Sequence, residues 1–188
     1  PIGNDELAIQ IGKMYYEIGF PEELEKRLER VSQDATWLKK VQYAGLYHQF
    51  LNQTEKANQL IEEALGEVES STDSIRIVNF LGQIGSEDKA LQILNSMREN
   101  EPSPAVSREI ATAYYSMGKD TIALNIYESL LQRNFNDPEL VGGVLMVYER
   151  LGEYEKAVQV LQRWLQLNPG DPQAAQKLEQ YQKMLSEG

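Results

Sequence analysis

The sequence predicts an all-α protein that consists of about five stacked helix pairs followed by a capping helix. A small or branched apolar residue recurs along the chain at intervals of 33, 33, 33 and 34 residues. These five recurring positions are Leu24, Ala57, Ala90, Ala123 and Ala157. No stretch shows the strict alternation or the enrichment in β-branched residues that is typical of strands. A repeat of this length indicates modules that cannot bury their apolar faces alone and therefore stack on their neighbours.

Each module begins with a first helix that ends five residues before its recurring position. The residues there tolerate a positive φ, as the C-terminal cap of a helix demands. They are Gly19, Asn52, Gly85, Gly118 and Gly152. Thirteen residues before each recurring position the chain has an apolar residue, and nine residues before it most often a tyrosine. These spacings lie on one face of a helix.

The recurring position itself starts the apolar stripe of a second helix, which continues four and seven residues later. Pro102 and Pro169 follow twelve residues after their recurring positions and end two of these helices, because proline cannot continue a helix. We therefore expect one array over residues 1–188, with repeats at about 5–37, 38–70, 71–103, 104–137 and 138–171. In residues 172–188 polar side chains surround a thin apolar stripe, which fits either a solvating cap helix or a degenerate sixth repeat.

The last repeats carry a family resemblance. The pattern Tyr148, Gly152, Tyr154, Ala157, Leu161, Pro169, and its partial copy Tyr114, Gly118, Ala123, Tyr127, resemble the tetratricopeptide repeat (TPR). The resemblance covers about residues 5–171, and it implies a right-handed superhelical solenoid of antiparallel helix pairs with a concave groove lined by the first helices. The second repeat departs from the pattern, since Tyr47 stands one residue before its column and Asn52 replaces glycine. We expect an extra residue in its turn. Two registers, one residue apart, are therefore possible for the side of that helix that faces inward.

The composition restricts the possible partners. The chain has 188 residues, 41% of them apolar, with 18 basic and 29 acidic residues and a net charge of −11. Such a charge repels the phosphates of nucleic acids and anionic lipid surfaces, so we expect no nucleic acid partner. No apolar run approaches the length of a membrane helix, so we expect no direct membrane insertion of this segment. The absence of cysteine leaves the compartment open, cytoplasmic or extracytoplasmic.

The first helical segment is apolar nearly all round. Its apolar residues are Leu7, Ile9, Ile11, Met14, Tyr15, Tyr16 and Ile18. A helix of this kind is normally covered on more than one side. We expect the chain to be a fragment of a longer protein with something packed against this end, the alternative being a helix that tolerates exposure.

Nothing in the sequence predicts a reaction centre. The sole histidine, His48, falls in the column otherwise rich in tyrosine, and neither a second imidazole nor a thiol completes a site. We therefore expect no catalytic residue, no metal and no cofactor, and a protein that is not an enzyme. Gly142 and Gly143 serve either close helix packing or a recess beneath a ligand. Trp164 is either a core plug against the cap helix or an exposed interface anchor.

The resemblance to the repeat family also implies which side chains face the groove. The ten candidate binding residues are Lys13, Tyr16, Gln49, Asn79, Gln83, Arg108, Thr112, Tyr115, Met146 and Arg150. The same columns include Ile9, Glu17, Gln42, Leu46, Phe50, Ile75, Gly82, Ser116, Gly142 and Glu149. Aromatic rings interleaved with amides suit an extended peptide or a partner helix. We expect a scaffold that binds a protein or peptide, and the alternative for this surface is a solvated wall without a ligand.

Two other functions fit the same features. The chain can be a structural spacer or self-assembly element of a larger membrane or secreted complex, with contacts and oligomerisation through its end faces. It can also be the regulatory region of a larger enzyme. The residues that family members use to clamp a C-terminal carboxylate are missing here, which disfavours a chaperone-tail cofactor.

Overall fold

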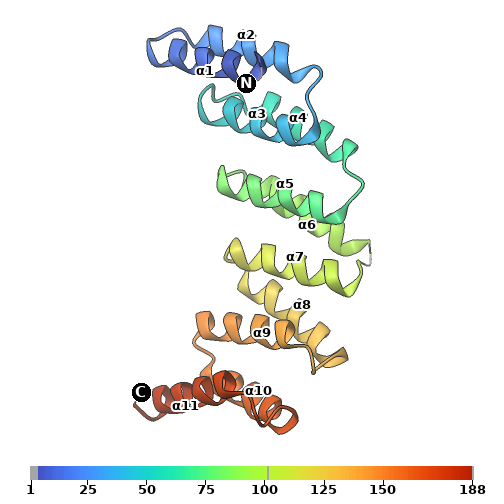
Figure 1. Ribbon diagram of the computed structural model, residues 1–188, viewed down its shortest axis with the longest axis vertical. Coiled ribbons are helices and arrows are strands. Elements are labelled where there is room, and N and C mark those ends of the chain that lie inside the picture. Colours follow the sequence, from blue (N-terminus) through green and yellow to red (C-terminus); the bar gives the residue numbers. More distant parts are fainter. Residues whose placement is uncertain (1–3, 101, 188) are drawn as a thin grey trace. The chain divides into compact units, whose positions relative to one another are not determined.

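The computed structural model describes residues 4–100 and 102–187 and confirms the all-α class. These residues form eleven helices and no strand (Figure 1). The helices are α1 (Asn4–Glu17), α2 (Pro21–Ser32), α3 (Trp37–Gln49), α4 (Thr54–Glu67), α5 (Ser71–Gln83), α6 (Glu87–Glu99), α7 (Pro104–Ser116), α8 (Asp120–Arg133), α9 (Pro138–Leu151), α10 (Tyr154–Leu167) and α11 (Pro172–Glu187).

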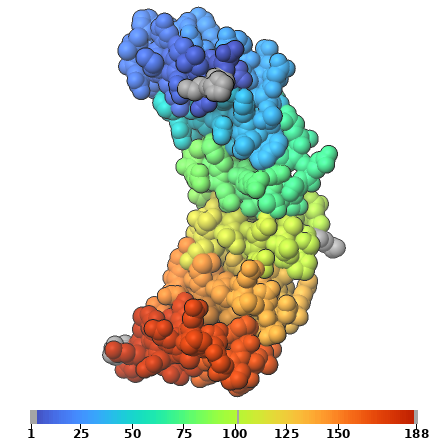
Figure 2. All heavy atoms as spheres, viewed as in Figure 1, coloured from blue at the N-terminus to red at the C-terminus, as the bar shows by residue number. Residues whose placement is uncertain are grey.

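The chain divides into two compact units, an N-terminal one up to Ile93 and a C-terminal one from Leu94, with the boundary inside α6. Within each unit the colour bands of Figure 2 follow the order of the sequence. The main packing contacts join helices that are consecutive or next but one, such as α3 with α4 and α5, or α9 with α7, α8 and α10. Packing between near neighbours in the sequence is the property of a repeat protein. The grouping of all five repeats into one array stays a prediction.

The turns inside the helix pairs have the predicted cap. Gly19, Gly85, Gly118 and Gly152 have φ between 69° and 94°, and Asn52 has a φ of 52°. These residues let the chain leave the first helix in the left-handed region, which glycine adopts without strain and asparagine tolerates. The capping column that the sequence predicts is therefore confirmed.

The second turn contains the extra residue that the sequence indicates. In four turns a backbone N–H reaches back five residues, as from Lys119 to the carbonyl of Tyr114 at 2.9 Å, whereas Gln53 reaches back six residues to Tyr47 at 3.0 Å. The insertion does not rotate the helix before it. Gln42 and Gln49 of α3 remain exposed. The groove positions predicted by counting back from Ala57 therefore still lie on the exposed side of this helix.

The predicted stripes form the core of both units. All five recurring positions are buried. The residues four positions later are buried as well, namely Leu28, Ile61, Leu94, Tyr127 and Leu161. In the pairs α1–α2, α3–α4, α7–α8 and α9–α10 the second helix packs on the first along this stripe, and burial of these side chains supplies the main stabilisation.

The C-terminal pair is closed by α11. Trp164 of α10 is only 8% exposed, and its indole N–H donates to Asp171 Oδ2 at 2.8 Å. The other oxygen of Asp171 accepts the backbone N–H groups of Gln173 and Ala174 at 3.0 Å, and so caps the start of α11. Trp164 is thus a core residue, which decides between its two interpretations.

The twin glycines of α9 have different environments. A Cβ atom at Gly143 would lie 2.5 Å from Cε1 of the Tyr127 ring, while a Cβ at Gly142 would meet nothing within 4 Å. Gly143 therefore serves the close packing of α8 on α9. Gly142 is exposed and makes no such contact.

These environments predict opposite effects for the same substitution. Gly143→Ala should lower the free energy of unfolding by about 1–3 kcal/mol, because the ring of Tyr127 must shift. Gly142→Ala should leave it unchanged or raise it by up to about 1 kcal/mol, because alanine is the better helix former. Urea unfolding followed by circular dichroism measures both, and equal effects of the two variants would contradict the packing role.

Candidate functional site

The ten candidate groove residues all lie on first helices, and none of them is buried. Five belong to the N-terminal unit (Lys13, Tyr16, Gln49, Asn79, Gln83) and five to the C-terminal unit (Arg108, Thr112, Tyr115, Met146, Arg150). The surroundings of the two groups differ.

The N-terminal unit has a hollow of about 510 Å³ between α1 and α3. Four of its lining residues come from the columns that the sequence analysis assigns to the groove: Ile9, Lys13, Gln42 and Leu46. The remaining lining residues are Asp5, Glu6, Lys39 and Tyr43. We call this the first-helix hollow. Its volume falls within the range of about 300–1,000 Å³ that is usual for ligand sites.

An aromatic cluster borders the first-helix hollow at Lys13. The rings of Tyr16 and Phe50 pack edge to face, with centroids 5.3 Å apart. The ammonium of Lys13 lies 5.4 Å from the centroid of Phe50, within the range of a cation–π contact. These contacts order three long side chains before any ligand arrives, which lowers the entropy lost on binding.

The charges of the first-helix hollow are mixed. Lys39 pairs with Asp5 at 3.3 Å across the mouth of the hollow. Within the described part of the chain Lys13 has no carboxylate partner, so its charge remains available. Gln49, Asn79 and Gln83 are exposed on α3 and α5 but do not line this hollow.

Sequence analysis missed four residues of this site, Asp5 and Glu6 on α1 and Lys39 and Tyr43 on α3. Each lies about one turn before a predicted groove position, outside the columns that the resemblance supplies. A signal was present nevertheless, because Lys39, Gln42, Tyr43 and Leu46 are spaced as one face of a helix.

In the C-terminal unit the candidate residues already contact one another or their neighbours. Arg108 forms an ion pair with Glu139 of α9. The Thr112 hydroxyl lies 2.8 Å from the hydroxyl of Tyr127 on α8. These bonds join α7 to the helices beside it, so both side chains hold helices together.

Arg150 is the most constrained of the candidates. Its guanidinium carbon lies 3.2 Å from the centroid of the Tyr115 ring, and Nη2 donates to the backbone carbonyl of Tyr115 at 2.6 Å. The same nitrogen pairs with Asp120 at the start of α8. Stacking on Tyr115, together with donation from one nitrogen to two acceptors, fixes the position of α9 against α7 and α8. Met146 lies on the same helix, half-buried.

Two side chains of the cap helix α11 contact another groove position, Glu149. Lys177 Nζ donates to Glu149 Oε2 at 3.1 Å, and the hydroxyl of Tyr181 donates to the same oxygen at 3.0 Å. The hydrogen bond from Lys177 is the main reason why the pKa of Glu149 lies below its usual value; partial burial opposes this shift and Tyr181 adds to it. α11 therefore takes up the carboxylate that a ligand would otherwise meet.

The described residues form no cluster that could hold a metal ion. They contain no group of three or more histidine, cysteine or acidic side chains placed to hold a metal ion. His48 is half-buried, and its Nδ1 has no hydrogen-bond partner among residues 4–100 and 102–187. None of the helices in this part of the chain has the length and apolar character needed to cross a membrane.

Comparisons with known proteins agree with the repeat pattern. The family model of the tetratricopeptide repeat matches residues 138–180, which cover α9, α10 and the first part of α11. No curated protein sequence matches the chain significantly. The resemblance that the sequence indicates is confirmed by the family model in the last repeat, where the pattern is strongest.

Solved structures share the fold. A tetratricopeptide repeat protein from Parabacteroides merdae is similar with a TM-score of 0.50 and 15% identity, over 97% of this chain and 73% of that one. MamA from AMB-1 is similar with a TM-score of 0.45 and 16% identity, over 89% of this chain and 93% of that one. PilF from Pseudomonas aeruginosa has a TM-score of 0.42 and 18% identity, over 86% and 75%. At these identities the likeness concerns the fold alone.

The contact between α11 and α9 predicts a measurable titration. Because the pKa of Glu149 is lowered in the folded protein, its ionised carboxylate stabilises the fold at neutral pH. This stabilisation is lost as the pH falls below about 4.3, the usual pKa of glutamate, and through the lower pKa of Glu149 in the folded protein. Lys177→Met should raise the pKa of Glu149 toward its usual value, as followed by carboxyl carbon NMR. Lys183→Met, on an exposed site of the same helix, is the control, and an unchanged titration in Lys177→Met would contradict the pairing.

Proposed function

Residues 138–180 belong to the tetratricopeptide repeat family, and from this premise we propose that the protein is an interaction module that binds a polypeptide segment in its first-helix hollow. Repeats of this family generally mediate protein–protein interaction or scaffolding, and their proteins are typically non-catalytic. The observation that supports the proposal is the coincidence of the hollow with Ile9, Lys13, Gln42 and Leu46, which the resemblance to the family assigns to the groove.

The lining suits a peptide with one apolar anchor. Ile9 and Leu46 offer an aliphatic floor for a side chain, and burial against it supplies affinity. The Gln42 amide carries two donors and an acceptor, which match the N–H and C=O groups of an extended backbone. Lys13 attracts a carboxylate of the bound segment.

The contacts in the C-terminal unit favour the N-terminal unit as the binding surface. A ligand at Arg108 or Arg150 must first displace Glu139 or Asp120, and the bonds it makes replace bonds that already exist. At Lys13 a ligand displaces no carboxylate of the described chain. The net gain on binding is therefore larger at the first-helix hollow.

A displayed library of random dodecapeptides tests this proposal. Selected peptides should lose at least ten-fold in affinity on Leu46→Gln, because the variant removes the aliphatic floor. Gln59→Ala, an exposed change on the second helix α4, is the matched control and should leave their affinity unchanged. Fluorescence anisotropy measures both. The proposal fails if no peptide is enriched, or if the enriched peptides bind Leu46→Gln as well as the unaltered protein.

One observation favours a second function, self-assembly through the N-terminal end. Leu7, Met14 and Ile18 are 48%, 65% and 68% exposed. Leu7 and Met14 lie on one side of α1, with half-buried Ile11 between them, and Ile18 directly follows the helix. Such a spacing forms a seam along which another helix can pack. A second copy of the chain offers the same seam, so that two α1 helices can cover each other.

Sedimentation velocity between about 1 and 200 µM examines this second function. The unaltered chain should associate, and Leu7→Lys with Met14→Lys should make it monomeric because both seam residues become charged. Leu151→Lys with Leu167→Lys alters two exposed leucines elsewhere and should leave association unchanged. A chain that stays monomeric throughout this range excludes self-assembly by α1.

A further inference from the structure

The second helices of the N-terminal unit are joined by a recurring ion pair. The lysine just before a recurring position reaches the glutamate five residues after the recurring position of the preceding repeat. Lys56 of α4 thus lies 2.6 Å from Glu29 of α2, and Lys89 of α6 pairs with Glu62 of α4. Each pair draws two successive second helices together.

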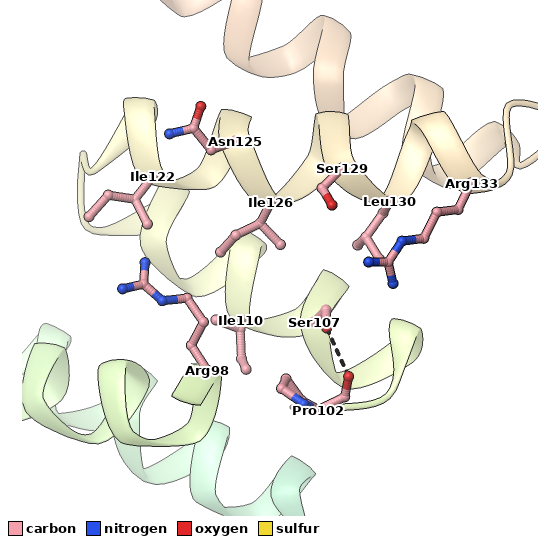
Figure 3. A pocket seen from close by; sticks show the side chains of 10 residues that line it. All are labelled: Arg98, Pro102, Ser107, Ile110, Ile122, Asn125, Ile126, Ser129, Leu130 and Arg133. Atoms are coloured by element: carbon pink, nitrogen blue, oxygen red, sulfur yellow. Dashed lines mark hydrogen bonds between the residues drawn. The ribbon is translucent and has the colours of Figure 1, made fainter. Parts of the chain in front are cut away.

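The C-terminal unit lacks this ion pair between α6 and α8. The equivalent positions are Ile122 and Asn95, neither of which is charged. Asn95 instead accepts a hydrogen bond from the hydroxyl of Tyr114 at 2.8 Å. At this junction there is a hollow of about 760 Å³, bordered by α6, α7 and α8 (Figure 3). We call it the second-helix hollow.

The second-helix hollow has an aliphatic floor. Ile110 and Leu130 are buried at its base, and Ile122 and Ile126 are half-exposed along α8. Figure 3 shows Ile110, Ile126 and Leu130 directed into the space between the helices. A partly exposed aliphatic wall gains free energy when an apolar side chain covers it.

Two arginines flank this floor. Arg98, at the end of α6, and Arg133, at the end of α8, are both exposed and line the hollow. The guanidinium of Arg98 lies 6.0 Å from the centroid of the Tyr114 ring. Within residues 4–100 and 102–187 neither arginine forms an ion pair, although the protein carries a net charge of −11. With respect to this part of the chain, both guanidinium groups are available to carboxylates, which they can bind with two hydrogen bonds each.

We propose that the second-helix hollow binds an acidic amphipathic segment of a partner protein. An aliphatic side chain of the segment covers Ile122 and Ile126, and carboxylates on either side of it pair with Arg98 and Arg133. The net charge of the protein repels such a segment at long range, but charges beyond about 8 Å are screened at physiological salt. The two arginines, which lie beside the bound segment, therefore dominate its electrostatic interaction with the protein. This site lies on other helices than the first-helix hollow and does not depend on the function proposed above.

The aliphatic floor distinguishes a protein segment from a small anion. Phosphate or a nucleic acid backbone can pair with arginines but has nothing to place on Ile122 and Ile126. A helix with leucines and glutamates on one face satisfies both parts of the hollow at once.

The test uses two labelled probes, an amphipathic 16-residue helix of leucine, alanine and glutamate and its counterpart with lysine in place of glutamate. Fluorescence anisotropy should give saturable binding of the glutamate probe and at least ten-fold weaker binding of the lysine probe. The methyl NMR signals of Ile122 and Ile126 should shift on addition of the glutamate probe. Equal binding of both probes, or competition by inorganic phosphate alone, would overturn the proposal.

Two matched variants locate the binding. Arg98→Glu with Arg133→Glu should weaken the glutamate probe at least ten-fold, whereas Lys26→Glu with Arg76→Glu makes the same change in net charge on exposed positions of the N-terminal unit and should have no such effect. Asn95→Glu with Ile122→Lys installs the missing ion pair without changing the net charge and should also abolish binding. Equal losses of affinity in the arginine variant and its charge control would refute this site. Full binding of the glutamate probe by the variant Asn95→Glu with Ile122→Lys would refute it as well. Circular dichroism shows that each variant is folded.

Discussion

The complete burial of the recurring position, a small residue in four of the five repeats, is the constraint on which the rest of the structure depends. Ala57, Ala90, Ala123 and Ala157 are between 0 and 4% exposed. A small residue lets the two helices of a pair approach until the flanking aliphatic side chains exclude water. The first pair has the larger Leu24 at this position, and Gly12 opposite it provides the room: a Cβ on Gly12 would lie 3.0 Å from Leu24 Cδ1. The larger side chain of Leu24 is thus matched by the absence of a side chain at Gly12, so the two helices stay close.

Features governed by local backbone chemistry were predictable from the sequence. The end of each first helix follows from the need for a positive φ, which only glycine and a few polar residues meet. The extra residue before Asn52 was visible as a displaced tyrosine, and the apolar stripes follow from helical periodicity. These features fix the fold class and the side of each helix that faces solvent.

The pairing of long side chains was not predictable. Nothing in the spacing of Arg150 and Tyr115 indicates that one stacks on the other, since the contact depends on how two repeats meet and on the rotamers of both residues. The same holds for Glu149, whose partners Lys177 and Tyr181 come from α11. Columns taken from a family therefore supplied exposed or half-buried candidate positions on the first helices of the C-terminal unit, but did not reveal which of these side chains are already engaged.

The two hollows show how one repeat can provide different surfaces. On the first-helix side of the N-terminal unit, the Lys13 ammonium pairs with no carboxylate of residues 4–100 and 102–187, while the corresponding side of the C-terminal unit is held by internal bonds. On the second-helix side the order is reversed, because the lysine and the glutamate of the N-terminal ion pairs are replaced by Ile122 and Asn95 in the C-terminal unit. Substitution at these two columns of the repeat exchanges a structural contact for an open surface.

The two tryptophans give each unit its own optical reporter. Trp37 begins α3 in the N-terminal unit, and Trp164 lies beneath the start of α11 in the C-terminal unit. Release of α11 exposes the Trp164 indole to water and shifts its emission to longer wavelengths, while Trp37 remains where it is. Replacing either tryptophan by phenylalanine therefore yields a protein whose remaining fluorescence follows one half of the chain, without any attached dye.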